Sequence, residues 1–405
     1  MRLLLAMFAA LVGLMFPVQA QAAPPVDLLL LNGKIWTGNP QQPEAEGIAI
    51  QGDRILAVGK SDDLRGLATE QTRVIDLAGR RVVPGFIDSH VHLLGSGQRL
   101  AQVALKDARD EAEFGKRLRA FDKKLPRDRW LLGGDWDHDR TLKGNLPDAA
   151  LLDKYVPDRL VLLRRYDGHM ALVNTRTLKA AGITADTPDP PGGVIYRRPG
   201  SKEPTGLLRD NAMGLVTKLI PAPDESEIAE SVRAALGEAR RLGVTSVVDM
   251  DGSGSKVRPA LFRHYQQLAR AGRLTLRIDL RWPLGDWQEL ADLGVRYPFG
   301  DDWVTIGGLK GFVDGSLGSS TARMFEPYLN EKESTGIYVT PLEKLQRDIV
   351  AADRAGLNVA VHAIGDRANA ELLDIFAAAA RANGPRDRRF RIEHAQHLRP
   401  QDIKR

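Results

Sequence analysis

Residues 82–92 read VVPGFIDSHVH, an apolar run that ends in two histidines. If residues 86–92 form a β-strand, its side chains alternate between two faces, so His90 and His92 point the same way. Two neutral imidazoles on one face at the end of a strand can bind one divalent cation. A pair of structural histidines explains the same pattern, so the choice between these readings depends on the rest of the chain.

The composition is that of an ordinary globular protein. Of 405 residues, 43% are hydrophobic and 27% are charged, and a chain of this length predicts a large barrel with an appended domain, or several domains. The 57 basic and 52 acidic residues are spread along the sequence, which argues against a nucleic-acid-binding face. Because cysteine is absent, only His, carboxylates or a modified Lys are left to hold a metal.

The first 22 residues are typical of a secretory signal peptide. Arg2 precedes an apolar run that ends at Phe16, and Ala20 and Ala22 form a small-x-small cleavage site. We expect cleavage after Ala22, export to a periplasm or beyond, and no membrane attachment of the mature chain. A retained membrane anchor is the alternative, although the run is short for a bilayer span.

Three parts are expected in the mature chain. Residues 23–83 read as short strands with turns at Asn32-Gly33 and Gly52-Asp53, which predicts the N-terminal part of a β-sandwich. Residues 84–405 carry the main α/β domain, and residues 95–231 are a long insertion after its first strand.

From residue 226 onward, predicted helices alternate with predicted strands. Counting residues 86–92, six strands are expected, the others at 244–250, 275–282, 304–314, 357–364 and 390–397. Repeated βα units indicate a parallel sheet, and polar ligands at successive strand ends favour a (β/α)8 TIM-type barrel over an open sheet. The barrel is incomplete, because six of its eight units are present.

Four of the eight histidines lie at the predicted carboxyl ends of strands one, five and six. They are His90, His92, His362 and His394, in the runs FIDSHVH, LNVAVHAIGD and RFRIEHAQ. In a barrel, that end of the strands is the catalytic rim, so these residues converge there. Each one alone fits a structural histidine, but together they predict a metal centre.

Lys310, in TIGGLKGFVDGSLGSSTA, is unusual because an ammonium would face this predicted metal centre. Cations repel it unless it is neutral or N-carboxylated by carbon dioxide, which makes it an anionic oxygen ligand. The alternative is a Lys paired with Asp314 or another carboxylate.

In combination, NGKIWTG, VVPGFIDSHVH, RYDGHMALVNT, GGLKGFVDGSLGSSTA, VHAIGDRA and RIEHAQ resemble the amidohydrolase superfamily, and within it the amidohydrolase-3 group with its N-substituted formamide deformylases. The resemblance covers nearly the whole mature chain. It implies a (β/α)8 barrel flanked by a β-sandwich, and hydrolysis of amide-like C–N bonds in small molecules by metal-bound hydroxide that attacks a carbonyl.

The resemblance also implies a ligand set for one or two divalent ions, most simply zinc. His90, His92 and Lys310 would hold the first ion, and carbamylated Lys310, His362 and His394 the second. His169 in RYDGH would face the substrate, and Asp314 is predicted to contact it as well.

One departure concerns the proton-transferring residue. The family's eighth strand supplies an Asp that binds metal and shuttles the proton, whereas this sequence stops at Arg405, soon after the sixth strand. No catalytic residue is therefore assigned with certainty, and we expect a fragment of a longer protein or a truncated, inactive product. A catalytically inactive relative that acts as a binding or regulatory protein is the alternative function.

Two further motifs leave alternatives open. The run Asp135-Trp136-Asp137-His138-Asp139 fits either a substrate-contacting segment or an exposed loop. Residues 249–254, DMDGSG, follow strand two and fit either the barrel mouth or a routine turn.

Overall fold

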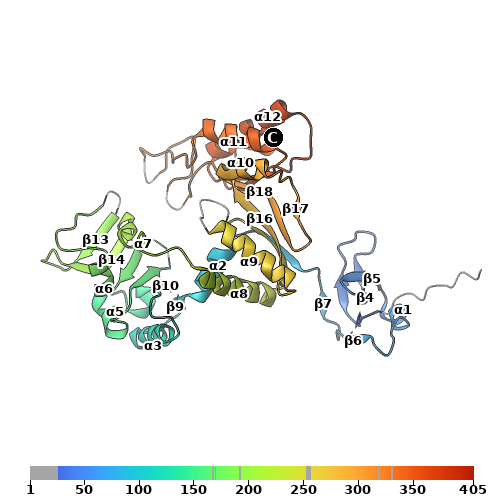
Figure 1. The fold of residues 1–405 in the computed structure, drawn as a ribbon, viewed down its shortest axis with the longest axis horizontal. Coiled ribbons are helices and arrows are strands. Elements are labelled where there is room, and N and C mark those ends of the chain that lie inside the picture. Colours follow the sequence, from blue (N-terminus) through green and yellow to red (C-terminus); the bar gives the residue numbers. More distant parts are fainter. Residues whose placement is uncertain are drawn as a thin grey trace, which may run out of the picture. The chain divides into compact units, whose positions relative to one another are not determined.

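The computed structural model describes residues 26–166, 168, 170–190, 193–251, 257–317, 320–329 and 332–405 (Figure 1). The predicted signal peptide and His169 lie outside these residues. The chain divides into two compact units, residues 1–85 and 86–405. Within the described ranges, no helix is both long enough and apolar enough to cross a membrane.

The first unit contains two small sheets of short strands. One has the order β5-β4-β1-β6 with antiparallel and parallel pairs, and the other has the order β3-β2-β7. Its elements are β1 Leu28–Leu31, β2 Lys34–Trp36, β3 Glu44–Ala45, β4 Gly47–Gln51, β5 Arg54–Gly59, α1 Ser61–Arg65, β6 Arg73–Asp76 and β7 Arg81–Val82. Leu29, Ala49 and Leu64 form its buried core. These sheets confirm the predicted N-terminal β-structure.

Six parallel strands form the main sheet of the second unit, in the order β20-β19-β18-β16-β15-β8. They are β8 Phe86–Val91, β15 Val244–Asp249, β16 Arg277–Pro283, β18 Val304–Phe312, β19 Val359–Ala363 and β20 Arg391–His394, and the short β17 Phe299–Gly300 pairs antiparallel with β18. The helices between and after them are α8 Glu225–Arg241, α9 Arg258–Arg270, η2 Leu284–Asp286, α10 Trp287–Asp292, α11 Leu342–Arg354, α12 Asp366–Asn383 and α13 Pro400–Ile403.

Local sequence explains the start of α8, and apolar packing holds the later helices. Asp224 accepts a hydrogen bond from the Glu227 N–H at 2.8 Å, and the Glu227 carboxylate accepts one from the Asp224 N–H at 3.0 Å. This capping box satisfies two N–H groups that the helix leaves unpaired. Leu345 of α11 and Leu372 of α12 are fully buried in one core with Val361 of β19.

The edge strands β8 and β20 are connected by side chains. Arg391 Nη2 donates to Ser89 O at 3.0 Å, and His90 Nδ1 lies 2.6 Å from Glu393 Oε2. The six strands thus form a nearly closed parallel barrel, which confirms the predicted incomplete TIM-type fold. Phe86 and Ile87 remain 59% and 70% exposed, because within the described residues β8 pairs with β15 alone.

A second, mixed sheet lies between β8 and α8 in the chain, with the order β13-β14-β12-β11-β10-β9. Its elements and neighbours are α2 Leu93–Ala101, β9 Val103–Ala104, α3 Glu111–Asp122, β10 Leu131–Trp136, α4 His138–Thr141, α5 Ala149–Tyr155, β11 Val161–Arg165, β12 Met170–Val173, α6 Thr175–Ala180, β13 Gly193–Arg197, β14 Pro204–Asp210, η1 Asn211–Met213 and α7 Gly214–Thr217. Helix α2 crosses α8 so closely that a Cβ on Gly97 would lie 2.0 Å from Ser231 O. Glycine is therefore required at this crossing.

Candidate metal centre

The four predicted histidines come together at the carboxyl ends of their strands. His90 is the second-to-last residue of β8, His92 directly follows that strand, and His394 ends β20. The ring centres of His90 and His394 lie 4.8 Å apart, those of His362 and His394 lie 4.6 Å apart, and those of His90 and His92 lie 5.7 Å apart. The barrel thus brings together His90 and His394, which are 304 positions apart in the chain.

His394 reaches this cluster through an unusual backbone conformation. Its φ is 76° and that of Ala395 is 44°, and both values lie in the left-handed region that residues other than glycine rarely adopt. Partial burial, with the nearby His362, His90 and Lys310, lowers the pKa of His394 to about 4. The ring is therefore neutral near pH 7, which is the form that binds metal.

Lys310 lies on β18 next to these histidines. It pairs in register with Ala360 of β19, while Phe312 pairs with His362, and its side chain is only 2% exposed. Burial lowers the pKa of Lys310 to about 8; Glu393 opposes this shift and Arg391 adds to it. No carboxylate of the described chain forms an ion pair with Lys310, so the alternative pairing with Asp314 is not seen.

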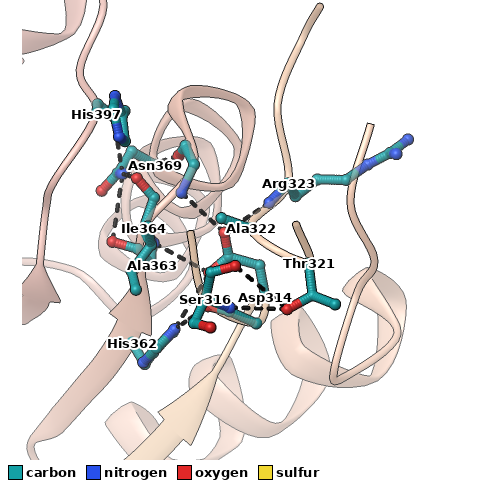
Figure 2. A network of polar contacts seen from close by, with 12 residues as sticks. Asp314, Ser316, Thr321, Ala322, Arg323, His362, Ala363, Ile364, Asn369 and His397 are labelled. Atoms are coloured by element: carbon teal, nitrogen blue, oxygen red, sulfur yellow. Dashed lines mark hydrogen bonds and ion pairs between the residues drawn. The ribbon is translucent and has the colours of Figure 1, made fainter. Parts of the chain in front are cut away.

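Asp314 instead anchors the loop that follows β18 (Figure 2). Its carboxylate accepts hydrogen bonds from the N–H groups of Arg323 at 2.8 Å, Ile364 at 3.0 Å and Gly365 at 2.8 Å. The side chain is 1% exposed. Both carboxylate oxygens accept from backbone groups, and the predicted substrate contact of Asp314 stays a prediction.

The same loop fixes the ring of His362. Its Nε2 lies 2.7 Å from Gly315 O, so Nε2–H donates to this carbonyl and Nδ1 keeps the lone pair. Burial lowers the pKa of His362, although the contacts with Gly315 and Asp314 oppose the shift. His362 is therefore held neutral, with one nitrogen left for a metal.

Two carboxylates that the sequence reading did not select contact the first pair of histidines. Glu393 Oε2 lies 2.6 Å from His90 Nδ1, and Asp251 Oδ1 lies 3.2 Å from His92 Nδ1. Glu393 directly precedes His394, and Asp251 belongs to the DMDGSG run, whose residues 252–254 lie outside the described chain. An acidic residue at the carboxyl end of a barrel strand was the available signal for both.

Asp249 supports the turn in which His92 lies. It accepts hydrogen bonds from the Leu93 N–H at 3.3 Å and from the Tyr265 hydroxyl at 3.1 Å, and it is fully buried. Burial, with the nearby Asp251, raises the pKa of Asp249 to about 6. Arg258 Nη1 lies 3.7 Å from this carboxylate and supplies a compensating charge.

A second group of possible ligands lies at the start of α4. Asp137, His138 and Asp139 bring three ligand atoms within 4.8 Å of one another. Among the described residues, the histidines and carboxylates of the barrel form no group of three that is this close. Asp137 Oδ1 accepts a hydrogen bond from the Asp139 N–H at 3.1 Å, and Asp139 lies 3.6 Å from Arg165. These local contacts explain the group as a helix start on the surface.

The barrel site nevertheless fits a metal by its donor chemistry. Two imidazoles bound to one tetrahedral zinc at ~2.1 Å have ring centres roughly 5 Å apart, close to the spacings of 4.6–5.7 Å found here. Lys310 lies beside these histidines. Its amine would become an anionic oxygen ligand after N-carboxylation and would then complete the ligand set that the four histidines begin. The donor set therefore fits a metal, which would be held by His90, His92, His362, His394 and N-carboxylated Lys310.

Comparisons with known proteins find a family and several relatives. Residues 73–405 match the model of the Amidohydrolase family. Protein LONG AFTER FAR-RED 3 of Arabidopsis thaliana is 42% identical over 92% of this chain and 65% of its own length. N-substituted formamide deformylase of Arthrobacter pascens is 25% identical over 91% of this chain and 69% of its own length. The chain thus spans about two thirds of these relatives.

A solved structure gives the same fold. The uncharacterized metal-dependent hydrolase from Pyrococcus furiosus is 30% identical, with a TM-score of 0.73 over 93% of this chain and 74% of that one.

Proposed function

This chain belongs to the amidohydrolase family, and on that premise we propose that it acts as a metal-dependent hydrolase of amide-like C–N bonds in small molecules. The observation that carries the proposal is the convergence of His90, His362 and His394, from three strands, beside the buried Lys310. The name of the formamide deformylase relative supports the C–N bond class.

The residues present define how the site would work. His90 and His92 would hold a first ion, His362 and His394 a second, and N-carboxylated Lys310 would bridge them. When bound, a divalent ion supplies Lewis acidity, which polarises a carbonyl oxygen and makes hydroxide available near neutral pH. The neutral amine that reacts with carbon dioxide is accessible because burial lowers the pKa of Lys310 to about 8.

Metal content tests the proposal directly. We expect the purified chain, loaded with zinc and bicarbonate, to hold about two zinc ions, and His92→Ala to lose zinc and any hydrolysis of N-formyl or N-acyl amines. His138→Ala is the matched control, because it removes a histidine from the Asp137–Asp139 group alone. A zinc-free wild-type chain, or zinc lost from His138→Ala but not from His92→Ala, would contradict the proposal and favour the non-catalytic alternative.

We also propose that the protein is exported and that its partner is a small-molecule substrate. The signal-peptide pattern of residues 1–22 supports export. A small-molecule partner is favoured over a nucleic acid because the basic residues are spread along the sequence without a cluster. N-terminal sequencing of the expressed protein should begin at Ala23, and an intact Met1 would contradict export by this route.

A further inference from the structure

The carboxylate of Glu393 is buried against a metal-ligand candidate from the opposite edge of the barrel. Glu393 Oε2 lies 2.6 Å from His90 Nδ1, and the Glu393 side chain is 5% exposed. Because a carboxylate only accepts hydrogen bonds, Nδ1 must carry the proton. The lone pair of His90 is then on Nε2.

Arg391 holds this carboxylate in place. Its Nη2 lies 2.9 Å from Glu393 Oε1 and also donates to Ser89 O at 3.0 Å, so one guanidinium contacts both β20 and β8. Glu393 Oε1 is buried, and the Arg391 guanidinium beside it supplies the opposite charge. Arg391 therefore offsets part of the cost of burying this carboxylate beside His90.

The backbone of β20 makes room for both Glu393 and His394 beside His90. Adjacent residues of a regular strand face opposite sides of the sheet. The left-handed φ of 76° at His394 breaks this alternation, so the His394 ring centre lies 4.8 Å from that of His90 while Glu393 contacts its Nδ1. Strain of this kind is found where a site requires it.

We infer that Glu393 is a positioning residue that fixes the tautomer and orientation of His90 for metal binding. The inference rests on the proposed function, because it assumes that His90 binds the metal. Metal-bound histidines commonly donate their second ring N–H to a carboxylate, which orients the ring and makes the binding nitrogen more basic. Arg391 keeps Glu393 in place and does not itself contact the His90 ring in any described interaction.

Zinc affinity of the full chain, measured by competition with a chromogenic chelator, tests this role. We expect Glu393→Ala to weaken zinc binding by about 10- to 100-fold. Glu393→Gln should retain most of the affinity, because its amide oxygen still accepts from His90 Nδ1. In a double-mutant cycle, adding Glu393→Ala to His90→Ala should cause no further loss, because Glu393 acts only through His90.

A matched control separates positioning from folding. Asp353, on helix α11, is also a buried carboxylate. Its arginine partners are Arg386 and Arg388, each at 3.1 Å. Asp353→Asn should lower stability and leave zinc affinity unchanged. If Glu393→Ala does not fold, Glu393→Asp, which keeps the charge but shortens the side chain, should still lose zinc affinity about ten-fold.

The outcomes distinguish this role from the proposed function. A zinc-binding wild type whose affinity is unchanged in Glu393→Ala or Glu393→Asp would overturn the positioning role alone. Losses that add in the double variant would also overturn it. A wild-type chain that binds no zinc would overturn the proposed function and this role with it.

Discussion

Lys310 Nζ lies 4.9 Å from the centre of the Phe312 ring, and this aromatic face is the partner that the described chain offers to a buried cation. The two residues are on the same strand and the Lys310 side chain is 2% exposed. A contact of this kind offsets only part of the cost of burying an ammonium. Lys310 therefore costs stability until it is neutral or modified.

Lys310→Met should stabilise the metal-free protein while removing the ligand proposed for Lys310. Because burial lowers the folded pKa to about 8 from 10.5, we expect the free energy of unfolding at pH 7 to rise by about 1–3 kcal/mol. Between pH 8 and 10.5 the folded state has lost the proton that the unfolded state keeps, so wild-type stability rises and the difference narrows. Urea unfolding at pH 7, 9 and 10.5 measures this. An equal or lower stability of the variant at pH 7 would contradict it.

Acid should destabilise the metal-free protein through His394. Its folded pKa is lowered to about 4 from 6.5. Between these values the unfolded chain binds a proton at His394 and the folded chain does not, so stability falls as the pH falls from 6.5 towards 4. We expect a shallower decline in His394→Asn. Urea unfolding with a chelator at pH 4.5, 5.5 and 6.5 tests this, and parallel curves for the two proteins would refute it.

Asp314→Asn should loosen the loop after β18 together with the start of α12. Its amide can no longer accept from all three N–H groups of Arg323, Ile364 and Gly365. Because hydrogen bonds to a charged acceptor are strong, we expect a loss of about 2–4 kcal/mol of unfolding free energy. Hydrogen exchange should accelerate at these three amides.

Asp366→Asn is the control for this prediction, because Asp366 accepts a single N–H, that of Phe325, at 3.0 Å. Its effect should be smaller and confined to Phe325. Equal losses of unfolding free energy in the two variants would show that the three hydrogen bonds of Asp314 stabilise the fold no more than the single hydrogen bond of Asp366.

Much of the fold and part of the candidate site follow from local sequence. The alternation of apolar runs with helical patterns predicts the five parallel strands β15, β16, β18, β19 and β20 and the helices α8 to α12 that connect them, whereas the two-residue β17 is too short to show a period. His90, His362 and His394 are recognisable because each ends such a strand, and parallel strands in a barrel place those ends at one rim.

The contacts that specify the site could not be read in this way. Glu393 and His90 are 303 positions apart and belong to edge strands that do not pair by backbone hydrogen bonds in the described chain, so no local pattern links them. The backbone partners of Asp314 could not be predicted for a similar reason, because Ile364 and Gly365 follow the next strand.

The sequence by itself thus determined the parallel α/β architecture and the histidines at its rim, because side-chain periodicity is a local property. Only the tertiary structure decided which nitrogen of His90 and His362 carries the proton and how deeply Lys310 is buried. Those properties depend on acceptors such as Glu393 and Gly315 O, which the closing barrel and its loops place beside the rings.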